Sequence, residues 1–342
     1  MAEINTYRDD IRHLFKGNLP WRKLSKTNIL ITGATGLIGS TLVEVLMSNP
    51  NKDYCVYVSS RNVEKARKRF VDYTSENFYI VEYDVMNPLE CEVQFDYIIH
   101  AASYASPNFF SKNPVEIVKS NIYGVSNLME YGLKHGMKRF LYVSSGEVYG
   151  EGDGRIFSEE YSGYVDCMKP RSCYPCSKRA SETLCVSYAD EYGADVVVAR
   201  PCHIYGPNFT ETDNRVYAQF IRNILHGEDI LMKSAGEQLR SWCYSVDCVS
   251  ALLFILLKGE SKEAYNIADP GSVITIRQLA EMLARIGNRK VVMDNPSDTE
   301  KKGYTPVSKA VFSIHKLEGL GWKVSGSLET KLRKTINHLR AQ

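Results

Sequence analysis

Three glycines at three-residue spacing constrain this chain more than any other feature. Gly33, Gly36 and Gly39 follow the apolar run Ile29–Thr32 directly and open a helical stretch. In such a unit the first glycine permits a tight turn, the second lets the backbone approach a pyrophosphate, and the third lets helix and strand pack closely. The helix N-terminus adds unpaired N–H donors and a positive dipole. A plain strand-to-helix turn is the alternative, but the surrounding strand–helix–strand pattern favours a dinucleotide site.

The rest of the first 200 residues repeats this alternation of apolar strand and helix. Apolar strands joined by helical crossovers predict a parallel sheet covered on both faces, which is the doubly wound α/β architecture of Rossmann type. The predicted strands are 29–32, 55–59, 78–83, 97–101, 139–144 and 196–200, and the predicted helices are 37–47, 63–70, 114–135 and 174–192.

The chain divides into three predicted parts. Residues 1–26 form a helical extension (apolar Ile4, Tyr7, Ile11, Leu14 and Phe15) that packs on the main body or on a neighbouring subunit. Residues 27–200 form the dinucleotide-binding domain. Residues 201–342 form mainly a smaller mixed α/β substrate-binding cap, with helices at 215–226, 246–257 and 276–286 and with returns to the Rossmann core. We expect a cleft between the two larger parts.

Composition narrows the class of partner. The 42 basic and 40 acidic side chains nearly cancel, so no overall field favours nucleic acid or an anionic membrane. The longest strongly apolar run, Ala251–Leu257, is far shorter than the roughly 20 residues that span a bilayer, and it predicts a buried helix. Nine scattered cysteines predict free thiols in a reducing, cytoplasmic compartment. Cys173 and Cys176 form a lone C-x-x-C without a second pair, so we expect no metal.

The cofactor type stays open in the sequence. The strand after the first helix ends in Ser59-Ser60-Arg61, where a dinucleotide site usually has an acidic residue for the adenosine ribose. These side chains would hold the 2′-phosphate of NADP, or Arg61 would stack on adenine and accept NAD. Asp84, after the third strand, is placed to accept from the adenine amino group, although a helix cap before Pro88 explains it almost as well.

A tyrosine and a lysine lie one turn apart at the start of a long predicted helix. Tyr174 and Lys178 therefore share a helix face. A phenol has a pKa of about 10, and a neighbouring ammonium lowers that pKa toward neutrality. With Ser144 and Ser145 at the end of the preceding strand, the pair predicts a proton acceptor for a substrate hydroxyl. His100 ends a strand near the cofactor and is expected to be a packing residue.

These motifs together resemble the extended short-chain dehydrogenase/reductases, the NAD-dependent epimerase/dehydratase family. The resemblance runs from about Asn28 to near residue 337 and implies NAD, or NADP, as cofactor. It rests on the three glycines, the segments 100–102 and 200–207, Asn121, Ser145, Tyr174 and Lys178. The residues expected at the dinucleotide are Gly33, Thr35, Gly36, Leu37, Ile38, Gly39, Arg61, Asp84, Val85, Ala101, Ala102, Ser103, Asn121, Ser144, Tyr174, Lys178 and Pro201. It also implies a homodimer through the helices around 113–135 and 174–192, although sheet packing would explain their apolar positions as well.

Within that family the likeness is strongest to UDP-glucuronate decarboxylases, through the segments 105–109, 144–150 and 170–174. This implies a UDP-sugar substrate held by Ser106, Arg215 and Arg240. The catalytic residues would be Tyr174, Lys178, Ser145 and Glu147. His203 departs from the family, where asparagine is usual. The alternatives are a 4,6-dehydratase or a 4-epimerase of surface polysaccharide synthesis, and, in another class, a non-catalytic dinucleotide sensor.

The implied chemistry starts with oxidation at carbon 4 of the sugar. The resulting ketone is β to the carboxylate of a hexuronate, and such an acid loses carbon dioxide easily. Return of the hydride makes the reaction redox-neutral, and Glu147 would serve the step at carbon 5. Dehydratases often pair that glutamate with an aspartate, and here Gly146 takes its position.

Overall fold

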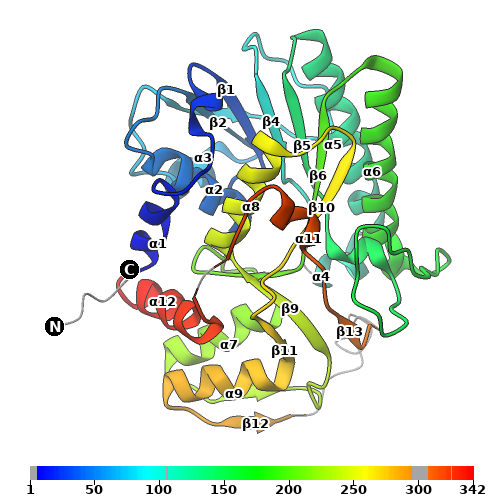
Figure 1. Ribbon diagram of the computed structural model, residues 1–342. Helices are drawn as coiled ribbons and strands as arrows, with labels where there is room; N and C mark the ends of the chain where they lie inside the picture. Colours follow the sequence, from blue (N-terminus) through cyan, green and yellow to red (C-terminus); the bar gives the residue numbers. More distant parts are fainter. Residues whose placement is uncertain (1–5, 105–106, 295–306, 325) are drawn as a thin grey trace.

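A seven-stranded parallel sheet forms the centre of the computed structural model, which describes residues 6–104, 107–294, 307–324 and 326–342. The strand order is β3-β2-β1-β4-β5-β6-β10 (Figure 1). The bounds are β1 Asn28–Thr32, β2 Cys55–Ser60, β3 Phe78–Glu82, β4 Tyr97–His100, β5 Arg139–Val143, β6 Val196–Pro201 and β10 Glu263–Ile267. The order reverses direction between β1 and β4, the point where ligands bind in doubly wound folds. The predicted fold class is confirmed.

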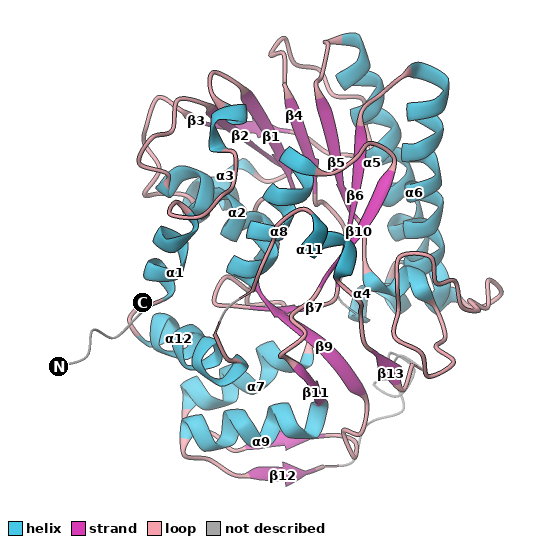
Figure 2. Cartoon of the chain, viewed as in Figure 1, coloured by secondary structure: helices cyan, strands magenta, loops and turns pink. Residues whose placement is uncertain are grey.

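Side chains of the sheet alternate between two cores, as the period of two of a strand requires. Leu30 and Ile98 pack in one core with α5 and α6, and their neighbours Ile29 and Ile99 pack in the other with α2 and α8. Helices therefore cover both faces (Figure 2). The bounds are α2 Leu37–Ser48, α3 Val63–Arg69, α5 Pro114–Lys134, α6 Cys173–Tyr192 and α8 Ser245–Lys258.

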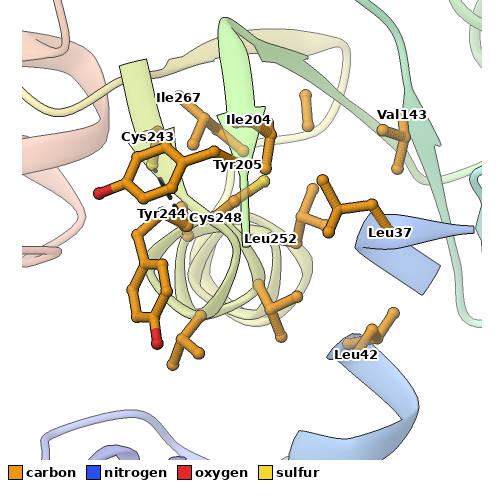
Figure 3. Packing of buried hydrophobic residues seen from close by; sticks show 14 of the residues in the cluster. Leu37, Leu42, Val143, Ile204, Tyr205, Cys243, Tyr244, Cys248, Leu252 and Ile267 are labelled. Carbon is orange, nitrogen blue, oxygen red and sulfur yellow. Dashed lines mark hydrogen bonds between the residues drawn. The ribbon is translucent and has the colours of Figure 1, made fainter. Parts of the chain in front are cut away.

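Helix α8 joins the main sheet to the smaller part of the molecule. All residues of the run Ala251–Leu257 are buried, which fits the predicted buried helix. Figure 3 shows Leu252 and Cys248 of α8 between Leu37 of α2 and Tyr205. A helix that is apolar on every side is stable only when it is enclosed by protein or lipid. None of the helices in the described residues is long and apolar enough to cross a membrane.

The smaller part is built on short strands that the sequence pattern did not predict. A four-stranded sheet contains β7 His203–Tyr205, β9 Leu239–Tyr244, β11 Val273–Thr275 and β13 Lys309–Ala310, and β8 Ile230–Met232 pairs with β12 Val291–Met293. Helices α7 Val216–His226 and α9 Ile276–Gly287 lie beside them (Figure 1). Most of these strands have two or three residues, too few to establish a period.

The N-terminal extension packs on the body of the same chain. Helix α1, Tyr7–Leu14, starts with a capping box between Thr6 and Asp9. The Tyr7 hydroxyl donates to Glu44 of α2 and accepts from Asn208 at 2.9 Å. A salt bridge links Asp10 to Lys334 of α12, Leu328–Arg340. Ile4 of the predicted apolar stripe lies outside the described residues.

The glycine loop yields a stability test. A Cβ at Gly39 would lie 2.3 Å from the Gly33 oxygen and 2.7 Å from the Ala34 Cα, both backbone atoms that cannot move aside, whereas a Cβ at Gly36 meets its nearest atom at 3.4 Å. We expect Gly39→Ala to lower the free energy of unfolding by about 1–3 kcal/mol. The matched variant Gly36→Ala should cost under about 1 kcal/mol. Urea unfolding measures both, and equal losses would contradict this account.

Candidate active site

Two glycines of the loop at the N-terminus of α2 differ in how closely the backbone packs against them. Gly33 has φ of +69°, and a Cβ there would lie 2.6 Å from the backbone of Ala101 and Ala102, so the loops after β1 and β4 touch. Gly36 caps α2 without a side-chain hydrogen bond, and no close protein contact demands a glycine there. A glycine that packing does not require, at a helix N-terminus, fits a backbone approached by a pyrophosphate. Thr35 precedes this cap, and Leu37 and Ile38 form the first turn of α2.

The ends of β2 and β3 form the side of the site expected for adenosine. The guanidinium of Arg61 donates to the Tyr104 hydroxyl at 2.5 Å and lies over that ring. Asp84 accepts from the backbone N–H of Met86 at 3.1 Å, and residues 85–86 form a turn. The alternative of a helix cap at Asp84 is therefore wrong, because the chain turns here instead of starting a helix. The Val85 carbonyl accepts from Asn127.

The loop after β4 is tied to α5 and α6 by side-chain hydrogen bonds. Ser103 donates to Asn121 at 2.8 Å, and Asn121 donates to Ser177 of α6 at 2.8 Å. His100 is fully buried and hydrogen-bonded to Thr32 at 2.7 Å. Burial, followed by the charge of Lys178, lowers the pKa of His100 to about 3. A neutral, enclosed imidazole agrees with the expected packing role.

Tyr174 and Lys178 lie in the first turns of α6, where Lys178 contacts the end of β5. Lys178 donates to the Val143 carbonyl at 2.8 Å, and its Nζ is 5.8 Å from the centre of the Tyr174 ring. Both side chains are buried, which disfavours their charged forms. Burial lowers the pKa of Lys178 to about 7. Burial and the charge of Glu147 raise the pKa of Tyr174 to about 12.

This geometry corrects the expectation that Lys178 lowers the pKa of Tyr174. The largest lowering contributions come from the hydrogen bond with Ser145 and from the charges of Arg215 and Arg171. The Lys178 ammonium is instead engaged by the carbonyl at the end of β5. In this structure desolvation outweighs charge attraction at both groups.

Ser145 and Glu147 are held by the short helix η2, Gly146–Tyr149. Ser145 caps this helix and accepts from the backbone N–H of Glu147 at 3.2 Å. Glu147 forms a two-pronged salt bridge with Arg171 of η3, Pro170–Ser172, at 2.9 and 3.0 Å. Sequence reasoning missed this partner, whose only signal was the family likeness at 170–174. A Cβ at Gly146 would lie 2.3 Å from the Phe312 ring, which explains why no aspartate fits there.

Arg240 and Arg215 lie near Glu147 and Tyr174, and they differ in their hydrogen-bond partners. Arg240 of β9 is 2% exposed and donates to the carbonyls of Leu239, Val307 and Ser308. Within the described part of the chain no carboxylate forms a salt bridge with it. Burial lowers its pKa to about 10, against the opposing effect of the charge of Glu147. A buried cation that no carboxylate contacts directly is costly, so this position favours an anionic ligand. Arg215, at the start of α7, is already paired with Asp213.

The remaining predicted residues lie around this centre. Ser144 follows β5 and is buried, with no hydrogen-bond partner for its Oγ among the described residues, and Pro201 ends β6. His203 of β7 is exposed, and its ring lies 5.4 Å from that of Trp242. Ser106 lies outside the described residues. All nine cysteines are free thiols, and no cluster in the described residues is arranged to hold a metal ion.

Comparison with known proteins identifies the family of this chain. The model of the NAD dependent epimerase/dehydratase family matches residues 29–268. The chain belongs to this family. It is 33% identical to UDP-glucuronic acid decarboxylase 1 of Xenopus tropicalis over 93% of its length and 73% of the relative. It is 34% identical to UDP-glucuronic acid decarboxylase 6 of Arabidopsis thaliana, over 87% of its own length and 84% of that relative.

A solved structure agrees with this family assignment. UDP-glucose 4-epimerase of Thermotoga maritima superposes with a TM-score of 0.77 at 27% identity, covering 92% of this chain and 99% of that one. The predicted enzyme class, nucleotide-sugar decarboxylases, dehydratases and epimerases with NAD as cofactor, is confirmed at the level of the family. The roles of individual site residues stay predictions.

The buried ammonium gives a pH-dependent prediction. The folded chain holds Lys178 at a pKa of about 7, against 10.5 for a free side chain. Below pH 7 the folded state carries the full cost of a buried charge. Between pH 7 and 10.5 the folded state loses the proton while the unfolded state keeps it, so stability rises with pH.

Lys178→Met removes this cost. We therefore expect the stability gained over wild type to be larger at pH 6 than at pH 9, by about 1–3 kcal/mol. Urea unfolding at the two pH values measures the difference. The exposed Lys65→Met serves as the control, and a gain for Lys178→Met that does not change with pH would contradict the assigned burial of charge.

Proposed function

We propose that this protein is a redox-neutral, NAD-dependent enzyme that oxidises a UDP-linked sugar at carbon 4, with UDP-glucuronate decarboxylation as its reaction. The observation that carries the proposal is the meeting of Ser145, Glu147, Tyr174 and Arg240 at one end of the sheet, beside an open helix N-terminus. Two relatives at 33–34% identity that carry the name UDP-glucuronic acid decarboxylase support the choice of reaction.

The dinucleotide would lie on the glycine loop, with its pyrophosphate at Gly36 and its adenosine near Arg61 and Asp84. When bound, NAD supplies a hydride acceptor that takes hydride from carbon 4 and returns it later. Arg240 would bind the substrate diphosphate, because it is a buried cation whose hydrogen-bond partners in the described part of the chain are carbonyls. Arg215 would add a second phosphate contact while it keeps its pairing with Asp213.

Proton transfer is the part that the chain's own residues would perform. Ser145 would hold the carbon 4 hydroxyl, and Tyr174 would accept its proton during oxidation and return it during reduction. Lys178 would hold α6 against the end of β5, beside the phenol, through its hydrogen bond to the Val143 carbonyl. A ketone at carbon 4 lets the neighbouring carboxylate leave as carbon dioxide, and Glu147 would orient the ring or move a proton at carbon 5.

4-Epimerisation and 4,6-dehydration are the alternatives. The solved 4-epimerase at 27% identity supports the first of these. The second is disfavoured in its glutamate–aspartate form, because the Phe312 ring leaves no room for a side chain at residue 146. A dinucleotide sensor without catalysis is the alternative in another class, and a full set of proton-transfer residues at one place argues against it.

We also propose that the protein forms a homodimer through the outer faces of α5 and α6. Ile117 and Leu128 of α5 are buried within the chain: Leu128 packs in the core with the sheet, and Ile117 packs with Phe110 and Tyr174. Val115 and Tyr123 of the same helix are 59% and 46% exposed and would be covered by a second copy.

Incubation with a panel of nucleotide sugars tests the reaction. We expect UDP-glucuronate to lose the mass of carbon dioxide, measured by mass spectrometry, while dTDP-glucose and GDP-mannose stay unchanged. Tyr174→Phe should abolish this turnover and keep NAD binding, because it removes the proton acceptor and little volume. Loss of water from a hexose, or an unchanged mass with inverted carbon 4, would refute decarboxylation. A Tyr174→Phe variant as active as wild type would refute the role of the phenol.

Binding of UDP alone tests the diphosphate site. Charge-assisted hydrogen bonds contribute about 1.5–3 kcal/mol each, so Arg240→Gln should weaken UDP binding about 10- to 100-fold in calorimetry. NAD affinity should not change. Arg277→Gln, which alters an exposed arginine of α9, is the control, and equal UDP affinity in both variants would contradict the assignment.

A further inference from the structure

Four side chains form a continuous row between η2 and α6. Glu147 is paired with Arg171 through both carboxylate oxygens. The Arg171 guanidinium lies over the ring of Phe110, 4.4 Å from its centre. Phe110 of α4, Pro107–Lys112, in turn stacks on Tyr174, with centres 4.8 Å apart and planes 24° apart. The row thus joins the two residues proposed to handle protons at adjacent carbons.

Only an arginine can make both contacts of residue 171. The edge of a guanidinium presents parallel N–H donors that match a carboxylate, and its flat face stacks on an aromatic ring. A lysine ammonium would attract Glu147 without fixing its orientation, and it has no flat face. The Nε of Arg171 is buried and has no hydrogen-bond partner among the described residues. The paired hydrogen bonds to Glu147 and the stack on Phe110 therefore fix this guanidinium.

The row of four side chains is buried at the end formed by Phe110 and Tyr174 and partly exposed at the end formed by Arg171 and Glu147. Phe110 is 1% exposed and Tyr174 is 6% exposed, whereas the side chains of Arg171 and Glu147 are 22% and 36% exposed. A half-exposed carboxylate on a short helix has several rotamers available, and an exposed ion pair alone stabilises only weakly. The stack on Phe110 removes that freedom on the arginine side, so the carboxylate meets a fixed partner.

We propose that Arg171 is a positioning residue that orients Glu147 and, through Phe110, holds Tyr174, so that the carboxylate and the phenol keep a fixed relation to one sugar ring. This inference rests on the proposed function. It assigns Arg171 no contact with substrate. It also accounts for an arginine three residues before the tyrosine, in the segment 170–174 that carried the family likeness.

The charges around Tyr174 predict a change in the pH dependence of the reaction that a loss of packing alone would not cause. The charged and titratable groups facing Tyr174 are Glu147 of η2, Arg171 of η3, Arg215 before α7, Lys178 of α6 and Tyr142 of β5. Glu147 raises the pKa of Tyr174 and Arg171 lowers it. Without Arg171 the charge of Glu147 is no longer balanced. The phenol then needs a higher pH to lose its proton.

The test compares Arg171→Lys and Phe110→Leu with wild type in the full-length protein, using the nucleotide sugar that wild type converts. We expect Arg171→Lys to lower kcat at least about tenfold with little change in KM. In Arg171→Gln, which also removes the positive charge, the limb of the kcat–pH profile that rises with pH should move up by about half a pH unit or more, whereas Arg171→Lys keeps the charge and should move this limb less. Phe110→Leu should lower kcat in the same direction, because it removes the stack and keeps an apolar side chain.

The controls are Arg179→Lys and Arg179→Gln in α6, where the arginine donates to the carbonyls of Val148 and Gly163. They should leave the pH profile unchanged. A second check uses Glu147→Gln, in which the further loss from Arg171→Lys should shrink, because the two residues act as one unit.

The outcomes separate the two claims. Wild type with no turnover on any nucleotide sugar overturns the proposed function and this inference with it. Active wild type together with an Arg171→Lys variant of equal kcat and an Arg171→Gln variant of unchanged pH profile overturns the inference alone. Full additivity of the Arg171→Lys and Glu147→Gln losses also overturns it, since independent residues do not position one another.

Discussion

The contact between the loops after β1 and β4 sets the geometry on which the rest of the structure depends. A Cβ at Gly33 would collide with the backbone of Ala101 and Ala102, so these two strand ends approach as closely as backbones can. The strand order reverses at this same pair of strands. The approach brings the N-terminus of α2 beside the loop that leads to α5, and the hydrogen bonds from Ser103 through Asn121 to Ser177 carry this placement on to α6. The position of Tyr174 is thereby tied to the glycine loop.

Two cationic side chains of the site are buried. Lys178 and Arg240 are both almost fully buried, and both donate to backbone carbonyls instead of carboxylates. A carbonyl stabilises a cation less than an anion does, which is why burial lowers the pKa of each side chain. Arg171 and Arg215, by contrast, are paired with acids. Arg171 and Arg215 are thus neutralised by the protein, whereas the hydrogen-bond partners of Arg240 among the described residues are backbone carbonyls.

Sequence patterns predicted much of the fold and part of the site. The predicted helix 174–192 and the observed helix Cys173–Tyr192 differ by one residue, and the helix ends at Gly193, a left-handed glycine cap that is a strong stop signal in a sequence. The short strands His203–Tyr205 and Leu239–Tyr244 were missed, since their pairing joins segments more than thirty residues apart. The direction of the Tyr174 pKa shift was also wrong in the sequence analysis. One turn of helix gives proximity to Lys178, but desolvation depends on every neighbour in three dimensions.

The sequence by itself determined the doubly wound sheet, the glycine loop and the one-turn spacing of tyrosine and lysine, because these follow from local periodicity and backbone sterics. Only the tertiary structure decided which charges meet. The pairing of Glu147 with Arg171, the hydrogen bond of Arg240 to the Val307 carbonyl and the ring of Phe312 against Gly146 join segments distant in the chain. Such contacts depend on packing between elements, and packing is a property of the assembled fold rather than of any stretch of residues.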